Sequence, residues 1–92
     1  MDTLNQEQIE AAVAELSDWS YEQGALTRTF RFHDFVNAVE FVERLAEVAE
    51  AQQHHPDIDI RYNKVTLRLS THSAGGVTVN DVSLAQAVEH LV

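Results

Sequence analysis

Residues 50–81 read E-A-Q-Q-H-H-P-D-I-D-I-R-Y-N-K-V-T-L-R-L-S-T-H-S-A-G-G-V-T-V-N-D, and they contain the clearest structural pattern in the chain. Pro56 excludes a helix at its own position and favours an extended conformation just before it. Apolar residues then alternate with polar ones, which predicts two strands over residues 57–62 and 64–71. Asn63 between them tolerates left-handed geometry, so a tight turn is expected there. The alternating apolar residues are Ile58, Ile60 and Tyr62, followed by Val65, Leu67 and Leu69.

Three helical patterns surround this hairpin. They cover residues 5–16, about 35–52 and about 79–90, and each begins at a side chain able to cap a helix. Gln8 and Asp81 each lie three residues beyond a cap, as in a capping box. The middle helix has a wide apolar stripe and is expected to be the main core helix. The caps are Asn5, Asp34 and Thr78, and the stripe consists of Phe35, Ala38, Val39, Phe41, Val42, Leu45, Ala46, Val48 and Ala49.

A second hairpin precedes the middle helix. Residues 19–32 switch to a period of two, and Gln23-Gly24 is the expected turn because glycine accepts a positive φ. The order of elements is therefore α-β-β-α-β-β-α. It predicts an α+β fold with one four-stranded antiparallel sheet and three helices packed on one face. Small domains often cover a bare sheet face or edge with a copy of themselves, so a homodimer or a tetramer is expected.

Length and composition narrow the classes of protein. Ninety-two residues predict a single domain over residues 1–92. Fifteen acidic residues against six basic ones give a net charge of −9, which repels phosphate backbones and disfavours nucleic-acid binding. Cysteine is absent, so no disulfide or thiolate chemistry is expected. With no signal-peptide pattern and no run of about 20 apolar residues, a cytoplasmic protein without a membrane partner is expected.

Three of the five histidines lie in the opening stretch, at His54, His55 and His72. Imidazole is the side chain whose ordinary pKa lies closest to neutral pH, so it can both give and accept protons there. If the segment before Pro56 runs beside the end of the second strand, the three rings can line one depression. Such a site would be suited to proton transfer. Its remaining wall would come from Ser70, Gly75 and Gly76.

Simpler explanations exist for each of these residues. The pair His54-His55 can be a solvated helix C-cap, Asp81 can serve only in a capping box, and Trp19 can be part of the core. A zinc site fits poorly, because adjacent residues in an extended chain point to opposite faces while metal ligands must converge. A serine nucleophile such as Ser70 has no nucleophile elbow or orienting group beside it. No metal is therefore expected.

Taken together, these motifs resemble the pterin-4a-carbinolamine dehydratase family. The α-β-β-α-β-β-α order agrees as well, so the resemblance extends over nearly the whole chain. Each short motif is weak alone, but the ordered set at these spacings is highly specific. The matching motifs are Glu50 followed by His54-His55-Pro56, Tyr62-Asn63-Lys64-Val65, Ser70-Thr71-His72, and Gly75-Gly76-Val77-Thr78 leading to Asp81.

The resemblance implies a hydro-lyase that dehydrates 4a-hydroxytetrahydropterin to quinonoid dihydropterin. This step recycles the cofactor of aromatic amino acid hydroxylases, and it uses neither a metal nor a bound cofactor. It also implies roles for particular residues. The catalytic residues would be His54, His55 and His72; Glu50 and Asp81 would support them, the Trp19 ring could stack on the pterin, and Ser70 and Thr71 would help to bind substrate.

An alternative of another class is a non-catalytic module on the same fold. The family includes dimerisation or assembly partners in transcription and in Rubisco assembly, sometimes with degraded sites. This chain keeps all three histidines and Asp81, which favours the enzyme. A fold match alone would not separate the two functions.

Overall fold

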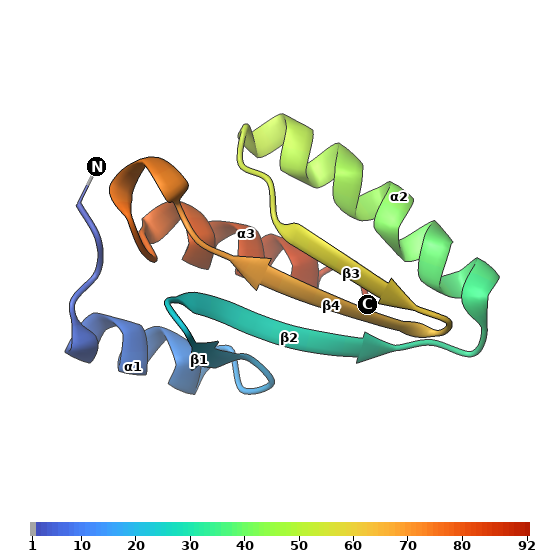
Figure 1. Ribbon diagram of the computed structural model, residues 1–92, viewed down its shortest axis with the longest axis horizontal. Coiled ribbons are helices and arrows are strands. Elements are labelled where there is room, and N and C mark those ends of the chain that lie inside the picture. Colours follow the sequence, from blue (N-terminus) through green and yellow to red (C-terminus); the bar gives the residue numbers. More distant parts are fainter. Residues whose placement is uncertain (1) are drawn as a thin grey trace.

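The computed structural model describes residues 2–92 and contains the predicted order of helices and strands (Figure 1). One short 3₁₀-helix, η1, is added between the last strand and the last helix. The elements are α1 (Gln6–Glu15), β1 (Ser20–Glu22), β2 (Ala25–Arg31), α2 (Phe35–Gln52), β3 (Asp57–Arg61), β4 (Lys64–Leu69), η1 (His72–Ala74) and α3 (Val79–Glu89).

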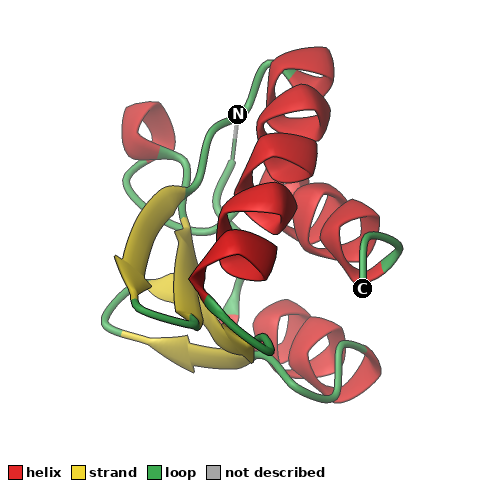
Figure 2. Cartoon of the chain, turned by 90° about the vertical axis from the view of Figure 1, so that its right-hand side faces the viewer, coloured by secondary structure: helices red, strands yellow, loops and turns green. Residues whose placement is uncertain are grey.

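The four strands form one antiparallel sheet in the order β1-β2-β4-β3. The two hairpins therefore meet through β2 and β4, with Leu26 opposite Leu69 and Phe30 opposite Val65. All three α-helices lie on the same face of this sheet (Figure 2), as predicted. β1 and β3 are the two edge strands.

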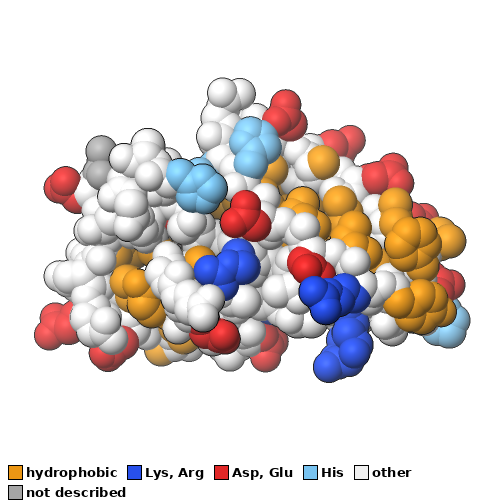
Figure 3. Space-filling model, in the orientation of Figure 1, with side chains coloured by type: hydrophobic (Ala, Val, Ile, Leu, Met, Phe, Trp, Pro, Cys, Tyr) orange, Lys and Arg blue, Asp and Glu red, His pale blue; other side chains and the backbone are white. Residues whose placement is uncertain are grey.

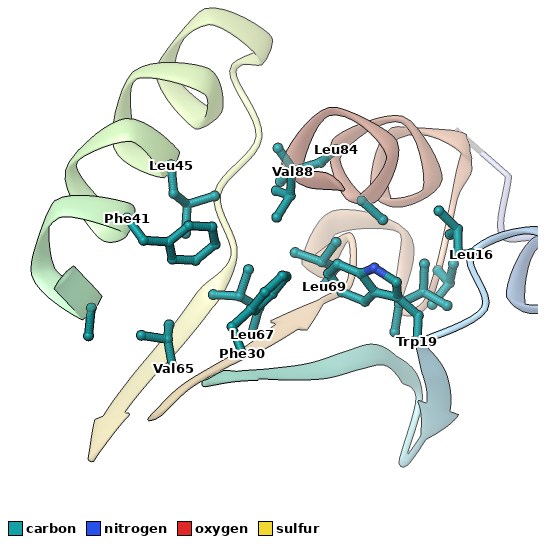
Figure 4. Packing of buried hydrophobic residues seen from close by; sticks show 14 of the residues in the cluster. Leu16, Trp19, Phe30, Phe41, Leu45, Val65, Leu67, Leu69, Leu84 and Val88 are labelled. Atoms are coloured by element: carbon teal, nitrogen blue, oxygen red, sulfur yellow. The ribbon is translucent and has the colours of Figure 1, made fainter. Parts of the chain in front are cut away.

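The core lies between the inner face of the sheet and the helices. Phe41 and Leu45 project from α2 toward β4, while Leu84 and Val88 project from α3 (Figure 4). Alternation along β4 sends every second residue inward, as a strand with one buried face requires. The fully buried residues of the two central strands are Leu26, Val65, Leu67 and Leu69.

Two residues of the predicted α2 stripe are exposed and do not belong to this core. Phe35 is 51% exposed and Ala46 is also exposed. Phe35 is the first residue of α2, beyond the region where the helix packs on the sheet. The predicted stripe was therefore too wide. The stripe residues that are buried are Ala38, Phe41, Leu45 and Ala49.

The two hairpin turns differ in how well the sequence predicted them. Gln23 and Gly24 have φ values of 50° and 80°, so the predicted turn is confirmed and is of the primed type that matches strand twist. In the second hairpin the left-handed residue is Tyr62, with φ of 53°, and not Asn63. Instead, the Asn63 side chain donates to the Phe32 carbonyl at 2.8 Å. Tyr62 therefore belongs to the turn and not to β3.

Helix capping follows the prediction closely. The Asn5 side chain accepts from the Gln8 backbone, and the Gln8 side chain accepts from Asn5 in return. Thr78 and Asp81 form the same reciprocal capping box at the start of α3. Among residues 2–92, no helix combines the length and the apolar character that a membrane span requires. The cytoplasmic location stays a prediction.

Candidate active site

The end of α2 determines where His54 lies. Gln53 takes a left-handed conformation with φ of 53° and ends the helix, while the His54 backbone N–H still donates to Ala49 at 3.1 Å. The chain then turns back toward β3. This reversal directs the His54 ring toward the start of α3, where its Nε2 lies 2.5 Å from Oδ1 of Asp81. The His54 side chain is only 12% exposed.

The Asp81 side chain is completely buried and accepts two further hydrogen bonds besides its contact with His54. Its Oδ2 accepts from the Thr78 backbone N–H at 2.8 Å and from the Thr71 hydroxyl at 2.9 Å. The hydroxyls of Thr71 and Thr78 lie 2.7 Å apart. Because the Asp81 side chain has 0% exposure, it cannot hold an edge of a substrate. It can orient the His54 ring, which is the supporting role that the sequence suggested.

His55 and Glu50 form a second, exposed pair. The Nε2 atom of His55 lies 2.5 Å from Oε2 of Glu50, one turn back along α2. Both side chains are more than half exposed, at 61% and 73%. The contact orients the imidazole but leaves most of its ring open to a ligand.

The second strand of the hairpin is shorter than its predicted range of residues 64–71, so His72 does not directly follow it. β4 stops at Leu69, and His72 begins η1 after two irregular residues. The reason is a tight loop: Thr71 bridges to Gly76, and Gly75 closes the loop with a left-handed φ of 78°. His72 is exposed and directly follows Thr71, so the Asp81 cluster anchors its backbone.

The three histidines therefore lie at the same end of the molecule. His54 and His55 follow α2, and His72 follows β4, where Thr71 shares the Asp81 carboxylate with His54. Pale-blue histidine side chains gather over this end of the molecule, near an acidic side chain (Figure 3). The arrangement is an open surface and not a deep cleft. A hollow of about 640 Å³ lies elsewhere, on the helix-free face of the sheet, and residues such as Thr29, Thr66 and Arg68 line it.

Two other predicted site residues are not members of this cluster: Trp19 lies apart from it, and Ser70 lies at its border. Trp19 is 3% exposed and packs in the core (Figure 4), where its Nε1 donates to Glu89 at 2.7 Å. In this position the indole cannot stack on a ligand, so the simpler core explanation holds. Ser70 is half-buried at the end of β4.

Thr78 is the one member of the cluster that sequence reasoning treated only as a helix cap. Its hydroxyl is fully buried and touches both Thr71 and the Asn80 backbone N–H. A threonine cap is common, so no sequence signal separates this one from an ordinary cap. Within residues 2–92, no group of three or more potential ligand side chains is arranged to hold a metal ion.

A buried carboxylate that orients an imidazole, beside further exposed imidazoles, is an arrangement that can carry out acid–base chemistry. The fold and the site thus define a small α+β protein with a histidine–carboxylate site. Comparison with known proteins identifies it further. Residues 2–91 match the family model described as Pterin 4 alpha carbinolamine dehydratase, and the chain belongs to this family. The enzyme family that the sequence suggested is confirmed.

Similar proteins cover the whole chain. A protein of Mycobacterium avium is 47% identical over 92 residues, all of this chain and 98% of its own, and a protein of Chloroflexus aurantiacus is 47% identical over 99% of its own. Both are named "Putative pterin-4-alpha-carbinolamine dehydratase". A crystal structure from Brucella melitensis, described as transcriptional coactivator/pterin dehydratase, matches with a TM-score of 0.93 and 34% identity over 98% of each chain.

A more distant structure shares the fold alone. It is a pterin dehydratase-like protein described as a RuBisCO assembly factor in the alpha-carboxysome. It matches with a TM-score of 0.65 and 20% identity, over 79% of this chain and 84% of its own.

Proposed function

We propose that this protein dehydrates 4a-hydroxytetrahydropterin to quinonoid dihydropterin by histidine acid–base catalysis. The observation that carries the proposal is the contact between His54 and the buried Asp81, in a cluster that also anchors the residue before His72. Membership of the dehydratase family supports the same reaction. The relatives' shared name and the 34% identical structure point to a pterin as the substrate.

The reaction needs one proton donor and one proton acceptor. The C4a–O bond breaks as the leaving hydroxyl takes up a proton, so water departs. The N5 lone pair forms the new N5=C4a bond, and the proton on N5 passes to a base. Imidazole can serve in either role near neutral pH. In our proposal His72 is the acid, and His54 and His55 lie near the ring as the proton acceptor and a binding group.

The open setting of the site suits this chemistry. A pterin is flat, so it can lie against exposed imidazoles without a deep cavity. Glu50 keeps the His55 ring in place, while Asp81 does the same for His54 from the interior. Ser70 stays a predicted substrate-binding residue because it is half-buried beside this surface.

A spectroscopic assay tests the proposal directly. The loss of 4a-hydroxytetrahydropterin is followed with and without purified protein, and acceleration in proportion to protein concentration is expected. A double variant, His54→Ala with His72→Ala, is the matched control and should abolish the acceleration. A rate equal to the uncatalysed one with the native protein would exclude the dehydratase function.

We also propose that the chain forms a homodimer through β3. Within residues 2–92 this edge strand pairs only with β4, so one side of its backbone has no strand partner there. Ile58 and Ile60 lie opposite Leu67 and Val65, on the helix side of the sheet, yet they are 41% and 40% exposed. An antiparallel β3 from a second copy would pair the backbone and cover both isoleucines.

Light scattering after size exclusion tests this assembly. The native protein should have the mass of two chains, and Ile60→Asp should have the mass of one. Thr29→Asp, on the helix-free face, is the control and should stay dimeric. A native protein that is monomeric at micromolar concentration would contradict the proposal. A stable dimer without dehydratase turnover would instead favour the alternative function, a non-catalytic dimerisation or assembly partner. The Brucella structure is described as a transcriptional coactivator as well as a pterin dehydratase.

A further inference from the structure

The hydrogen bonds around Asp81 determine which group donates and which accepts in each contact of the cluster. The Thr78 backbone N–H can only donate, and a carboxylate can only accept. The Thr71 hydroxyl lies 2.9 Å from the same carboxylate oxygen and must therefore donate its single hydrogen to Asp81. It follows that the 2.7 Å contact between Thr71 and Thr78 is a bond in which Thr78 donates and Thr71 accepts.

The same reasoning applies to the other end of the cluster. The Thr78 hydroxyl accepts from the Asn80 backbone N–H at 3.2 Å, so its own hydrogen is free to point toward Thr71. No buried side-chain nitrogen or oxygen within residues 2–92 lacks a partner. A buried network in which all groups are satisfied resists rearrangement, because a reversed proton would leave one group unpaired.

The other oxygen of the Asp81 carboxylate decides the tautomer of His54. Its Nε2 lies 2.5 Å from Oδ1 of Asp81, and an oxygen that only accepts requires a hydrogen on that nitrogen. In a neutral imidazole with hydrogen on Nε2, the lone pair is on Nδ1. The Nε2 atom is engaged with a carboxylate that is wholly buried, so it is turned away from any ligand.

We propose that Nδ1 of His54 accepts the proton from N5 of the pterin, and that Thr71 and Thr78 are positioning residues that maintain this tautomer through Asp81. The inference rests on the proposed dehydratase function. It also assigns Thr71 a different role from the substrate binding that the sequence suggested, because the hydrogen of its hydroxyl points to Asp81. Thr71 is buried, which agrees with a role inside the protein.

Nuclear magnetic resonance of the native protein tests the tautomer without any turnover. Long-range proton–nitrogen correlations on ¹⁵N-labelled protein distinguish the two ring nitrogens of each histidine across a pH titration. Neutral His54 is expected to carry its hydrogen on Nε2. A hydrogen on Nδ1 would overturn the inference, whatever the dehydratase assay gives, so this result is separate from failure of the proposed function.

Variants of Thr71 test the positioning role. Thr71→Val keeps the shape but removes the hydroxyl, and we expect kcat to fall roughly tenfold with KM nearly unchanged, together with a smaller share of the Nε2–H tautomer. Thr71→Ser keeps the hydroxyl, so its kcat and its share of the Nε2–H tautomer should equal those of the native protein. The matched control is Thr66→Val, which removes a hydroxyl 2.8 Å from Thr29 on the exposed sheet face and should change neither. A rise in KM alone for Thr71→Val would show that Thr71 binds substrate and would refute the positioning role.

Discussion

Replacing Asp81 by Asn is the sharpest test of the buried cluster, because the two side chains have the same shape. The Thr78 backbone N–H can only donate, so the amide oxygen must take the place of Oδ2, next to Thr78 and Thr71. The amide NH₂ group then faces Nε2 of His54 in place of Oδ1. An NH₂ group donates, so Nε2 must act as the acceptor and cannot carry a hydrogen. The hydrogen of the neutral ring then lies on Nδ1.

The cost in stability can be worked out from the three contacts. A hydrogen bond to a charged group contributes about 1.5–3 kcal/mol, and a neutral one about 0.5–1.5 kcal/mol. The two retained bonds from Thr71 and Thr78 each weaken by about 1 kcal/mol, while the bond to His54 is rebuilt in the opposite sense. We expect the free energy of unfolding to fall by about 2 kcal/mol. A domain that begins with about 5–15 kcal/mol remains folded after this change.

The effect on the reaction should be larger. With a hydrogen on Nδ1, His54 can no longer accept a proton there, and loss of a general base lowers kcat by about 10²- to 10⁴-fold. Urea unfolding followed by circular dichroism measures the first effect, and steady-state dehydratase kinetics measure the second. Asp59→Asn is the control, because this exposed carboxylate pairs with exposed Arg61 at 3.1 Å, and the substitution should cost less than about 0.5 kcal/mol.

Two results would refute the reasoning. If Asp81→Asn were as stable as the native protein, the three contacts would not hold the cluster together. If the variant lost about 2 kcal/mol of stability but kept its kcat within a few-fold, the orientation of His54 would not matter for catalysis.

Three further predictions concern single side chains. His72→Ala should lower kcat by about 10²-fold or more while urea unfolding changes little, because His72 is exposed; nearly unchanged kinetics would exclude it as the acid. Phe41→Ala should lower the free energy of unfolding by about 3–5 kcal/mol, since the ring is fully buried with its centroid 4.8 Å from that of Phe30; a loss below about 1 kcal/mol would mean that the core repacks. Gln23→Asn should raise the midpoint of thermal unfolding, because Asn-Gly is the preferred pair for a turn with two positive φ values; a lower midpoint would contradict that turn.

The sequence was most informative where short-range chemistry decides the structure. Both capping boxes and the Gln23-Gly24 turn depend on residues that are close in the chain, and all three are confirmed. The second turn shows the limit of such reasoning. Asn63 had the better intrinsic tolerance of left-handed geometry, but its side chain is used to bind the Phe32 carbonyl, and Tyr62 takes the positive φ instead.

The candidate site was only partly predictable for a similar reason. The spacing of the histidines indicated a common site, but the partner of the His54 ring, Asp81, lies 27 residues away in the chain. Nothing in the sequence shows that Asp81 would be completely buried or that Thr71 would donate to it. Trp19 had two open explanations, and only packing against the core could separate them.

The buried position of Trp19 also makes this residue an intrinsic fluorescence probe of the protein interior. It is the single tryptophan of the chain, it lies edge-on to Phe30 with ring centroids 6.2 Å apart, and its indole donates to Glu89, which also pairs with Arg28. Its fluorescence emission should shift to longer wavelength when water reaches the indole, which requires the interior to open. Intrinsic fluorescence therefore offers a direct record of unfolding, whereas spectral changes of the pterin itself are the better signal for ligand binding.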